Sequence, residues 1–436
     1  MKNILQNHID KEIPYLNKKK LLLAVSGGLD SMVLLHLFQE LKFDIAIAHC
    51  NFQLRGVESF GDQNFIQDYA DANGIPIYVT QFDTEAFAKD YKLSTQVAAR
   101  ALRYNWFYEL LEEEKFDYIL TAHHADDNLE TFLINFTRGT GLEGLTGIPV
   151  ENDKIIRPLL FLTRTEIDDY AKKHQIEWRE DSSNASDKYV RNKIRHHLVP
   201  ILKELNPNFM ASFLKTENYL QQSQSMVEDA SSMVYQQVAR EEGDQVHFDL
   251  NKLMQLPNYQ SYLYQWLKEF GFTAWDDIYD LVSGQSGKQV FASGYRLLKD
   301  RDSLIVCPVN EEEIDAEFHI AENQTEVNIP LKLTLCKVSD ISIETNKTIF
   351  VDADQLVYPL VVRKWKTGDI FMPFGMNGKS KKVSKLFKDE KLSLIEKENT
   401  WILCSGKEIV WVIGMRADHR FRTVNATKNI LKIELI

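Results

Sequence analysis

Short apolar runs alternate with helical segments through the first two hundred residues of the chain. Each apolar run is followed by a segment whose apolar residues recur at helical spacing. The expected strands are residues 21–25, 44–50, 76–82, 118–122 and 155–160, and the expected helices are residues 32–41, 62–73, 95–113, 126–137 and 164–174. This alternation predicts an α/β fold, a Rossmann-like parallel sheet of about five strands with helices on both faces. Such sheets bind ligands at the carboxyl ends of their strands.

The rest of the chain has other patterns, which predict smaller α+β domains. A chain of 436 residues exceeds one compact core, since domains average roughly 150 residues. Helical spacing continues over residues 198–240, hairpin-like runs occur within 246–308, and residues 331–436 are rich in strand patterns. The acidic stretch 310–328 has few apolar residues and is interpreted as a linker. We predict three domains, at residues 1–205, 206–310 and 330–436.

Composition excludes several classes of protein. Hydrophobic residues make up 44% of the chain and charged residues 26%, as in ordinary globular proteins. The cysteines form no Cys-x-x-Cys pair, which argues against a zinc ribbon, an iron–sulfur site or a disulfide framework. The N-terminal segment lacks the apolar core of a signal peptide, and its apolar runs are too short to span a bilayer. We therefore expect a cytoplasmic protein with no membrane partner, and a monomer or a homodimer are both open.

The strongest local signal is a Ser-Gly-Gly-x-Asp-Ser hexapeptide between the first expected strand and the first expected helix. Its residues are Ser26, Gly27, Gly28, Leu29, Asp30 and Ser31. Glycines let backbone N–H groups approach phosphate oxygens, and a helix N-terminus adds a favourable dipole. The serines can donate hydroxyl hydrogen bonds, and Asp30 can hold a magnesium ion that bridges phosphates. A plain capped turn is the alternative, but the position after the first strand favours a phosphate site.

This hexapeptide resembles the pyrophosphatase loop of the PP-loop family, also called N-type ATP pyrophosphatases. The resemblance implies that ATP, with Mg²⁺, is cleaved between its α and β phosphates. AMP is then transferred to a substrate oxygen and pyrophosphate leaves. The loop itself does not say which oxygen is adenylated. It also differs from the Gly-x-x-x-x-Gly-Lys-Ser/Thr loop of other ATPases.

Basic residues follow several of the expected strands. His49 ends the second strand and is soon followed by Arg55. Arg100 and Arg103 share a helix face, where they can clamp ATP phosphates or an RNA backbone. A solvated basic face is the simpler alternative for this pair. Arg138 opens a glycine-rich segment, which predicts a tight loop beside a ligand.

The densest polar cluster is His-His-Ala-Asp-Asp-Asn-Leu-Glu-Thr at residues 123–131, directly after the fourth expected strand. Asp127 and Glu130 are three residues apart and share a helix face, so together they can bind a cationic amine or a metal. Capping of the helix by Asp126 and Asp127 is the simpler alternative. The position at a strand end favours a functional cluster.

Taken in order, these motifs resemble one group within the PP-loop family, the tRNA(Ile)-lysidine synthases. The resemblance is tight over residues 20–200 and ends with the acidic segment 180–184 and an Arg-Asn-x-Ile-Arg tail at Arg191 and Arg195. It implies that the wobble cytidine of the CAU-anticodon isoleucine tRNA is adenylated, and that the amine of free lysine then displaces AMP at C2. The codon read changes from AUG to AUA. Catalytic roles are implied for Asp30, His123, Asp127 and Glu130.

The sequence departs from the family pattern at two places. Asn51 or Phe52 stands where the family often has a second histidine, and Gln96 stands where it usually has an acidic residue. The net charge of −12 disfavours nucleic acid, but residues 361–391 hold nine Lys/Arg against three Asp/Glu. Contacts with tRNA are expected at Arg55, Arg100, Arg103, Arg138, Arg191, Arg195, Lys381 and Lys382.

Three other functions stay open on the sequence alone. A tRNA thiolase shares the loop, but many thiolases need cysteines beside the site, and here the cysteines are scattered. An amide-forming synthetase fed by glutamine would need a glutaminase domain, for which the sequence has no motif. An inert RNA-binding protein would not need Asp30 and Glu130, so the intact motifs argue against it.

Overall fold

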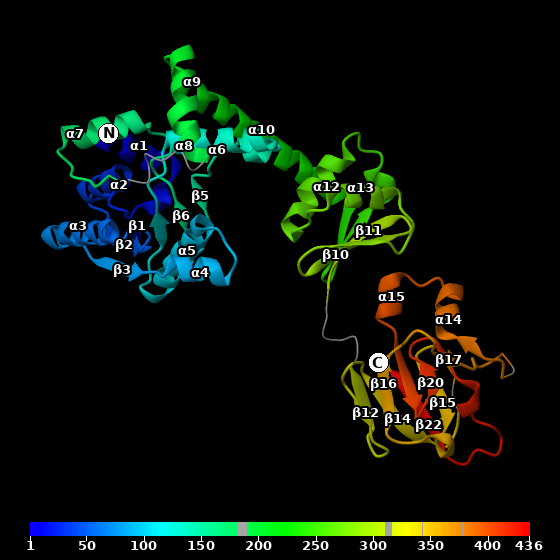
Figure 1. The fold of residues 1–436 in the computed structure, drawn as a ribbon. Helices are drawn as coiled ribbons and strands as arrows, with labels where there is room; N and C mark the ends of the chain where they lie inside the picture. Colours follow the sequence, from blue (N-terminus) through cyan, green and yellow to red (C-terminus); the bar gives the residue numbers. More distant parts are fainter. Residues whose placement is uncertain (181–189, 310–315, 342, 377) are drawn as a thin grey trace. The chain divides into compact units, whose positions relative to one another are not determined.

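The computed structural model describes residues 1–180, 190–309, 316–341, 343–376 and 378–436 (Figure 1). The chain forms two compact units, residues 1–227 and residues 228–436. Most of the predicted acidic motif at residues 180–184 lies outside the described residues. No helix within these ranges has the length and apolar character needed to cross a membrane.

A six-stranded sheet in the order β3-β2-β1-β4-β6-β5 organises the first unit. Neighbouring strands are parallel except for the edge pair β5 and β6, which is antiparallel. The strands are β1 (Lys20–Ala24), β2 (Asp44–Asn51), β3 (Ile77–Gln81), β4 (Tyr118–Leu120), β5 (Glu151–Asn152) and β6 (Ile155–Ile156). The predicted α/β fold is confirmed, with one antiparallel edge strand that was not predicted.

Helices cover both faces of this sheet because successive side chains of its central strand point to opposite faces. Leu21 and Leu23 of β1 pack in one cluster with α1, α2, α3 and α7. Leu22 packs on the other face with Phe107 and Leu110 of α5. The helices are α1 (Lys2–Glu12), α2 (Leu29–Glu40), α3 (Val57–Asn73), α4 (Thr84–Asp90), α5 (Thr95–Glu113), α6 (Ala125–Arg138), α7 (Arg164–Lys173), α8 (Val190–Lys193), α9 (Val199–Leu205) and α10 (Phe209–Val238), which continues into the second unit.

Two local predictions for the first unit need correction. The strand expected at residues 155–160 ends at Ile156, because Leu159 and Leu160 are buried in a turn. The apolar run therefore reflects burial and not an extended backbone. The helix expected at residues 62–73 begins at Val57, and α1 and α4 were not predicted. Leu5 and Ile9 of α1 are fully buried and four residues apart, so its helical signal was present but short.

The second unit consists of small β-rich parts with short helices (Figure 1). A five-stranded antiparallel sheet, β7-β8-β11-β10-β9, comes first in the chain, and a five-stranded and a four-stranded sheet follow. Its elements are β7 (Ala239–Glu242), β8 (Gln245–Asp249), α11 (Leu250–Leu253), α12 (Tyr259–Leu267), α13 (Trp275–Ser283), β9 (Gln289–Phe291), β10 (Tyr295–Asp300), β11 (Ser303–Pro308), β12 (Glu317–Ile320), β13 (Glu326–Val327), β14 (Leu333–Val338), β15 (Thr348–Asp352), β16 (Leu360–Lys364), β17 (Ile370–Phe371), β18 (Lys381–Lys382), α14 (Val383–Asp389), α15 (Leu394–Glu398), β19 (Trp401–Ser405), β20 (Glu408–Val412), β21 (Arg416–Ala417) and β22 (Ile430–Leu435).

The linker expected at residues 310–328 is wrong for its second half. Strand β12 pairs with β16 and strand β13 pairs with β14, both in antiparallel register. In β12 the exposed Glu317 and His319 alternate with the less exposed Phe318 and Ile320. A strand with one solvated face needs few apolar residues, which is why composition alone suggested a linker.

Candidate active site

The predicted phosphate loop joins the carboxyl end of β1 to the first turn of α2. The Ser26 amide donates to Ser31 Oγ at 3.2 Å, and that hydroxyl donates to the Gly28 carbonyl at 2.9 Å. Gly28 is the N-cap of α2, so the loop and the first amides of the helix form one surface of N–H donors. This is the backbone arrangement that binds phosphate at a helix N-terminus.

Glycine is required at one position of the loop for a conformational reason. Gly27 has a φ of +85°, which residues with a Cβ rarely adopt. A Cβ there would also lie 3.4 Å from the Cδ1 of Ile66. The Gly27 carbonyl accepts a hydrogen bond from the Arg179 amide at 2.9 Å, and the Arg179 side chain binds the buried Asp62. The loop is therefore fixed from the α3 side by residues distant in sequence.

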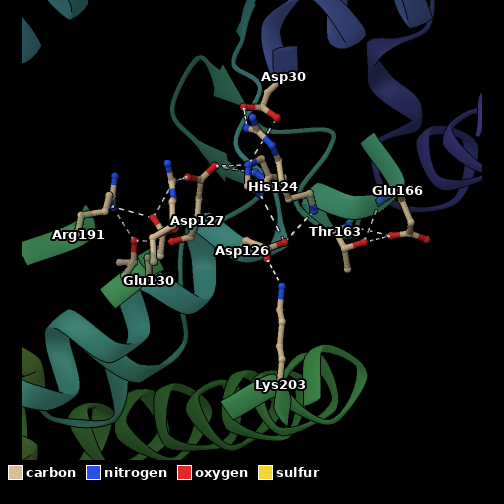
Figure 2. A network of polar contacts seen from close by, with 12 residues as sticks. Asp30, His124, Asp126, Asp127, Glu130, Thr163, Glu166, Arg191 and Lys203 are labelled. Carbon is tan, nitrogen blue, oxygen red and sulfur yellow. Dashed lines mark hydrogen bonds and ion pairs between the residues drawn. The ribbon is translucent and has the colours of Figure 1, made fainter. Parts of the chain in front are cut away.

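Asp30, in the first turn of α2, lies between a cation and a histidine. Its Oδ2 accepts a hydrogen bond from Arg164 Nη1 at 2.5 Å, and its Oδ1 lies 3.6 Å from His124 Nε2 (Figure 2). Burial raises the pKa of Asp30, although His124 and Arg164 oppose the shift. Among the described residues, Asp30 Oδ1 is buried without a hydrogen-bond partner. One carboxylate oxygen is thus available to a ligand.

His124 connects Asp30 with the acidic cluster at the start of α6. Its side chain is buried, and its Nε2 lies 3.5 Å from Asp127 Oδ2. Asp127 also caps the helix, because the His124 amide donates to its Oδ2 at 3.1 Å. Asp126 accepts hydrogen bonds from the Arg164 amide at 2.8 Å and from Lys203 Nζ at 3.0 Å. Burial alone would raise the pKa of Asp126, but these two donors lower it.

Glu130 is held by a bidentate ion pair with Arg195. Arg195 Nε donates to Oε1 at 2.6 Å and Nη2 donates to Oε2 at 3.0 Å, while Arg191 Nε lies 3.6 Å from Oε2 (Figure 2). The Glu130 side chain is 2% exposed, and burial raises its pKa against the opposing charge of Arg195. A π-helical turn at Ile194–Leu198 carries Arg195, a widening that often occurs at functional sites.

His123 lies in a different environment from its neighbour. Thr121 Oγ1 and His123 Nδ1 are 2.9 Å apart, and the ring is half-buried. Burial, together with the charges of Arg157, Arg191 and Arg100, lowers the pKa of His123 to about 4 against the opposing charge of Asp127. Its imidazole is therefore neutral near pH 7 and surrounded by cations.

The remaining predicted site residues are spread along the chain. Arg55 pairs with Asp62 at 2.9 Å. On α5, the guanidinium groups of Arg100 and Arg103 stack on Tyr104 and Phe52, at 4.7 and 5.1 Å from the ring centroids. Arg138 is exposed at the end of α6. In the second unit, Lys381 pairs with Asp389 at 2.8 Å beside the exposed Lys382.

Sequence patterns missed several charged residues in and around the site. The sequence indicated Arg164 only as the start of a helix, but its guanidinium donates to Asp30 and its amide donates to Asp126. Lys203, Arg157 and Glu217 were not singled out. Glu217 of α10 is buried and accepts a hydrogen bond from Asn128 at 2.5 Å. An arginine inside an apolar run, as at Arg157, was the one signal available before the structure.

Residues 1–202 match the family model of a PP-loop domain, residues 241–309 a TilS substrate binding domain, and residues 360–435 a TilS substrate C-terminal domain. A tRNA(Ile)-lysidine synthase of Parabacteroides distasonis is 39% identical and covers 96% of each chain. The enzyme of Bacteroides thetaiotaomicron is 36% identical over 98% of each chain. The enzyme of Bacillus subtilis is 30% identical over 95% of this chain and 93% of that protein.

The chain belongs to the tRNA(Ile)-lysidine synthase family. The resemblance deduced from the motifs is therefore confirmed, and the chain is an ATP-dependent ligase with an ATP-binding PP-loop domain. The alternatives of a thiolase, an ammonia-using synthetase and an inert RNA-binding protein are set aside. In this lysidine synthase family member, the phosphate loop follows β1 and the acidic cluster follows the adjacent strand β4.

Proposed function

We propose that this protein ligates free L-lysine to C2 of the wobble cytidine of the CAU-anticodon isoleucine tRNA. ATP adenylates the C2 oxygen, pyrophosphate leaves, and the lysine ε-amine then displaces AMP. The modified base reads AUA in place of AUG. The observation that carries this proposal is the identity of 39% over 96% of both chains with a protein named tRNA(Ile)-lysidine synthase.

The phosphate loop is the proposed binding site for ATP. Its amides and the hydroxyls of Ser26 and Ser31 would hold the phosphates at the N-terminus of α2. Mg²⁺ fits Asp30 Oδ1, which has no hydrogen-bond partner among the described residues, since magnesium commonly takes one or two carboxylates together with substrate phosphates. When bound, the ion would neutralise negative charge on the departing pyrophosphate.

Asp127 and Glu130 are the proposed residues for lysine, with different roles. The Glu130 carboxylate is engaged by Arg195 on both oxygens, so we propose that it orients Arg195 beside the reacting groups. Asp127 lies 3.5 Å from Arg195 and has a 17% exposed side chain, so it is the more accessible carboxylate. The lysine amine must lose a proton to attack, and Asp127 is the proposed acceptor. The neutral His123 is a second candidate for proton transfer.

The tRNA is proposed to contact basic residues in both units. We assign this role to Arg55, Arg100, Arg103, Arg138, Arg191, Arg195, Lys381 and Lys382. The domain boundaries at residues 205, 310 and 330 and a cytoplasmic location remain part of this proposal. Phosphate contacts of this kind position RNA without reading its sequence.

The test is transfer of radiolabelled lysine to a purified tRNA transcript. Wild-type protein, Mg-ATP, labelled lysine and the CAU isoleucine tRNA should yield label in acid-precipitated tRNA, and omission of ATP should abolish it. A methionine tRNA with the same anticodon serves as the specificity control. Release of AMP that depends on tRNA without label from lysine would refute the assigned amine donor. Absence of both would refute base adenylation.

A further inference from the structure

Arg157 is the most deeply buried arginine of the first unit for which the mechanism above has no use. It follows the short strand β6 and is 4% exposed. Its Nη1 donates to the Pro149 carbonyl at 2.8 Å. Its Nε is buried without a hydrogen-bond partner among the described residues.

The charge of Arg157 also lacks a counter-ion. Within the ranges that the structure covers, no carboxylate lies within ion-pair distance of its guanidinium. Burial lowers the pKa of Arg157, Tyr104 opposes the shift, and the like charge of Arg100 adds to it. A buried cation that faces neutral groups and another cation is costly unless an anion completes the site.

Neighbouring elements add further positive groups at this edge of the sheet. Strands β4 and β6 are parallel neighbours, so His123 and Arg157 both follow carboxyl ends at one edge. Arg100 extends from α5, with its guanidinium stacked on Tyr104. The charges of Arg100, Arg157 and Arg191 all act on His123. Positive groups from separate segments therefore act on the same imidazole.

We propose that Arg157 and Arg100, with His123, form a second phosphate subsite, distinct from the phosphate loop. The two sites lie toward opposite faces of the sheet, since α2 follows the loop on one face and α5 covers the other. A guanidinium binds phosphate through two parallel hydrogen bonds, and burial strengthens both. The inference rests on the proposed function, because the phosphate belongs either to ATP or to the tRNA backbone.

Two binding measurements on the full-length protein test this subsite and identify the source of the phosphate. The variants are Arg157→Met and Arg100→Met, each of which removes one cation. Lys154→Met is the matched control, because Lys154 precedes β6 at the opposite edge and is exposed. The ligands are a non-hydrolysable ATP analogue with Mg²⁺ and the CAU isoleucine tRNA transcript, the latter titrated at several salt concentrations.

A nucleotide phosphate predicts that the analogue binds about 10-fold more weakly to both arginine variants, with tRNA affinity unchanged. A tRNA phosphate predicts about 10-fold weaker tRNA binding and a salt dependence reduced by about one phosphate contact. The control should match the wild type in both measurements. Wild-type affinities for both ligands in both arginine variants would overturn the proposal.

A purely structural role for Arg157 makes a different prediction. If the residue served to hold Pro149, Arg157→Met would lower the thermal midpoint and leave binding intact, which also overturns the subsite. The proposal expects a midpoint at or above that of the wild type, because an uncompensated buried charge is removed. Should Arg157→Met not fold, Arg157→Lys and Arg100→Met decide the same comparison. Neither binding measurement depends on lysine transfer. Failure of the proposed reaction, which the labelled-lysine assay detects, is therefore distinguished from failure of the subsite.

Discussion

The geometry of the ion pair between Glu130 and Arg195 predicts how the protein responds when either partner is replaced. Both oxygens of a carboxylate with 2% side-chain exposure accept hydrogen bonds from one guanidinium, at 2.6 and 3.0 Å. The Arg195 side chain is 35% exposed, so water screens part of the attraction. The two partners should therefore respond unequally to replacement.

Removing Arg195 should cost more stability than removing the charge of Glu130. Arg195→Met leaves a buried carboxylate with Arg191 at 3.6 Å, and we expect the free energy of unfolding to fall by about 2–3 kcal/mol, below the full value for a buried pair because of the exposure of Arg195. Glu130→Gln keeps the shape and one acceptor, and should cost about 1–2 kcal/mol. In the double variant neither charge is left alone, so the coupling energy should be about 1.5 kcal/mol.

Urea unfolding of the four proteins at several pH values measures this cycle. In Arg195→Met the pKa of Glu130, already raised by burial, rises further. A raised folded-state pKa means that stability is complete below the unfolded pKa, about 4.3, and is lost as the pH rises through the folded value. The deficit of this variant should therefore vanish near about pH 4 and grow toward neutrality.

Kinetics provide the functional half of the same test. Glu130→Gln and Arg195→Met should each slow lysine transfer at least about 10-fold, with the double variant no slower, because the two groups act as one unit. Affinity for the ATP analogue should stay within about twofold, since among the described residues neither side chain forms a hydrogen bond or ion pair with the phosphate loop. Additive losses of stability within about 0.5 kcal/mol, or unchanged lysine kinetics, would refute the reasoning.

Three further predictions follow from single contacts. Because the φ of Gly27 is +85°, Gly27→Ala should lose about 1–2 kcal/mol of stability and bind ATP about 10-fold more weakly in titration calorimetry. Gly74→Ala is the control: Gly74 has a φ of +63° at the end of α3, so this variant should lose similar stability and bind ATP normally. Lys203 helps to lower the pKa of Asp126, and this lowered pKa stabilises the fold above about pH 4 and is lost as a contribution when the pH falls through the folded value. Lys203→Met should therefore move acid unfolding to higher pH. An unshifted acid midpoint, measured by circular dichroism, would contradict this prediction. Burial raises the pKa of Glu217 to about 7, so Glu217→Gln should match the stability of the wild type near about pH 4 and exceed it by roughly 3 kcal/mol at about pH 8. Urea unfolding at the two pH values measures this difference. Equal stabilities at both pH values would show that the carboxyl is not buried as the structure has it.

Those parts of the site that depend on local pattern were predictable from the sequence. Ser26–Ser31 could be placed after a strand because glycines, a cap and an apolar run are all contiguous. Asp127 and Glu130 could be placed on one helix face from their spacing alone. The sheet followed from alternation, although its antiparallel edge β5 has two residues and too weak a pattern to detect.

The partners of these residues could not be predicted, because tertiary folding supplies them. Arg164 reaches Asp30 across 134 residues of sequence, and Lys203 reaches Asp126 across 77. Arg191 and Arg195 both reach Glu130, from a segment more than 60 residues further along the chain. Without these partners the sequence suggests two free carboxylates at residues 127 and 130, whereas the structure engages both oxygens of Glu130.

Guanidinium groups and carboxylates, joined through His124, continue through the whole site and link its two halves. Successive neighbours lie 2.5 to 3.6 Å apart in the series Arg164, Asp30, His124, Asp127, Arg195, Glu130 and Arg191 (Figure 2). Each group sets the protonation of its neighbours, so apparent pKa values from a pH–rate profile belong to the series and not to one residue. ATP at Asp30 and lysine at Asp127 would act on the same series from two places, joined by His124. Kinetic losses of single variants are therefore expected to be non-additive, and roles must be assigned from cycles such as Glu130 with Arg195.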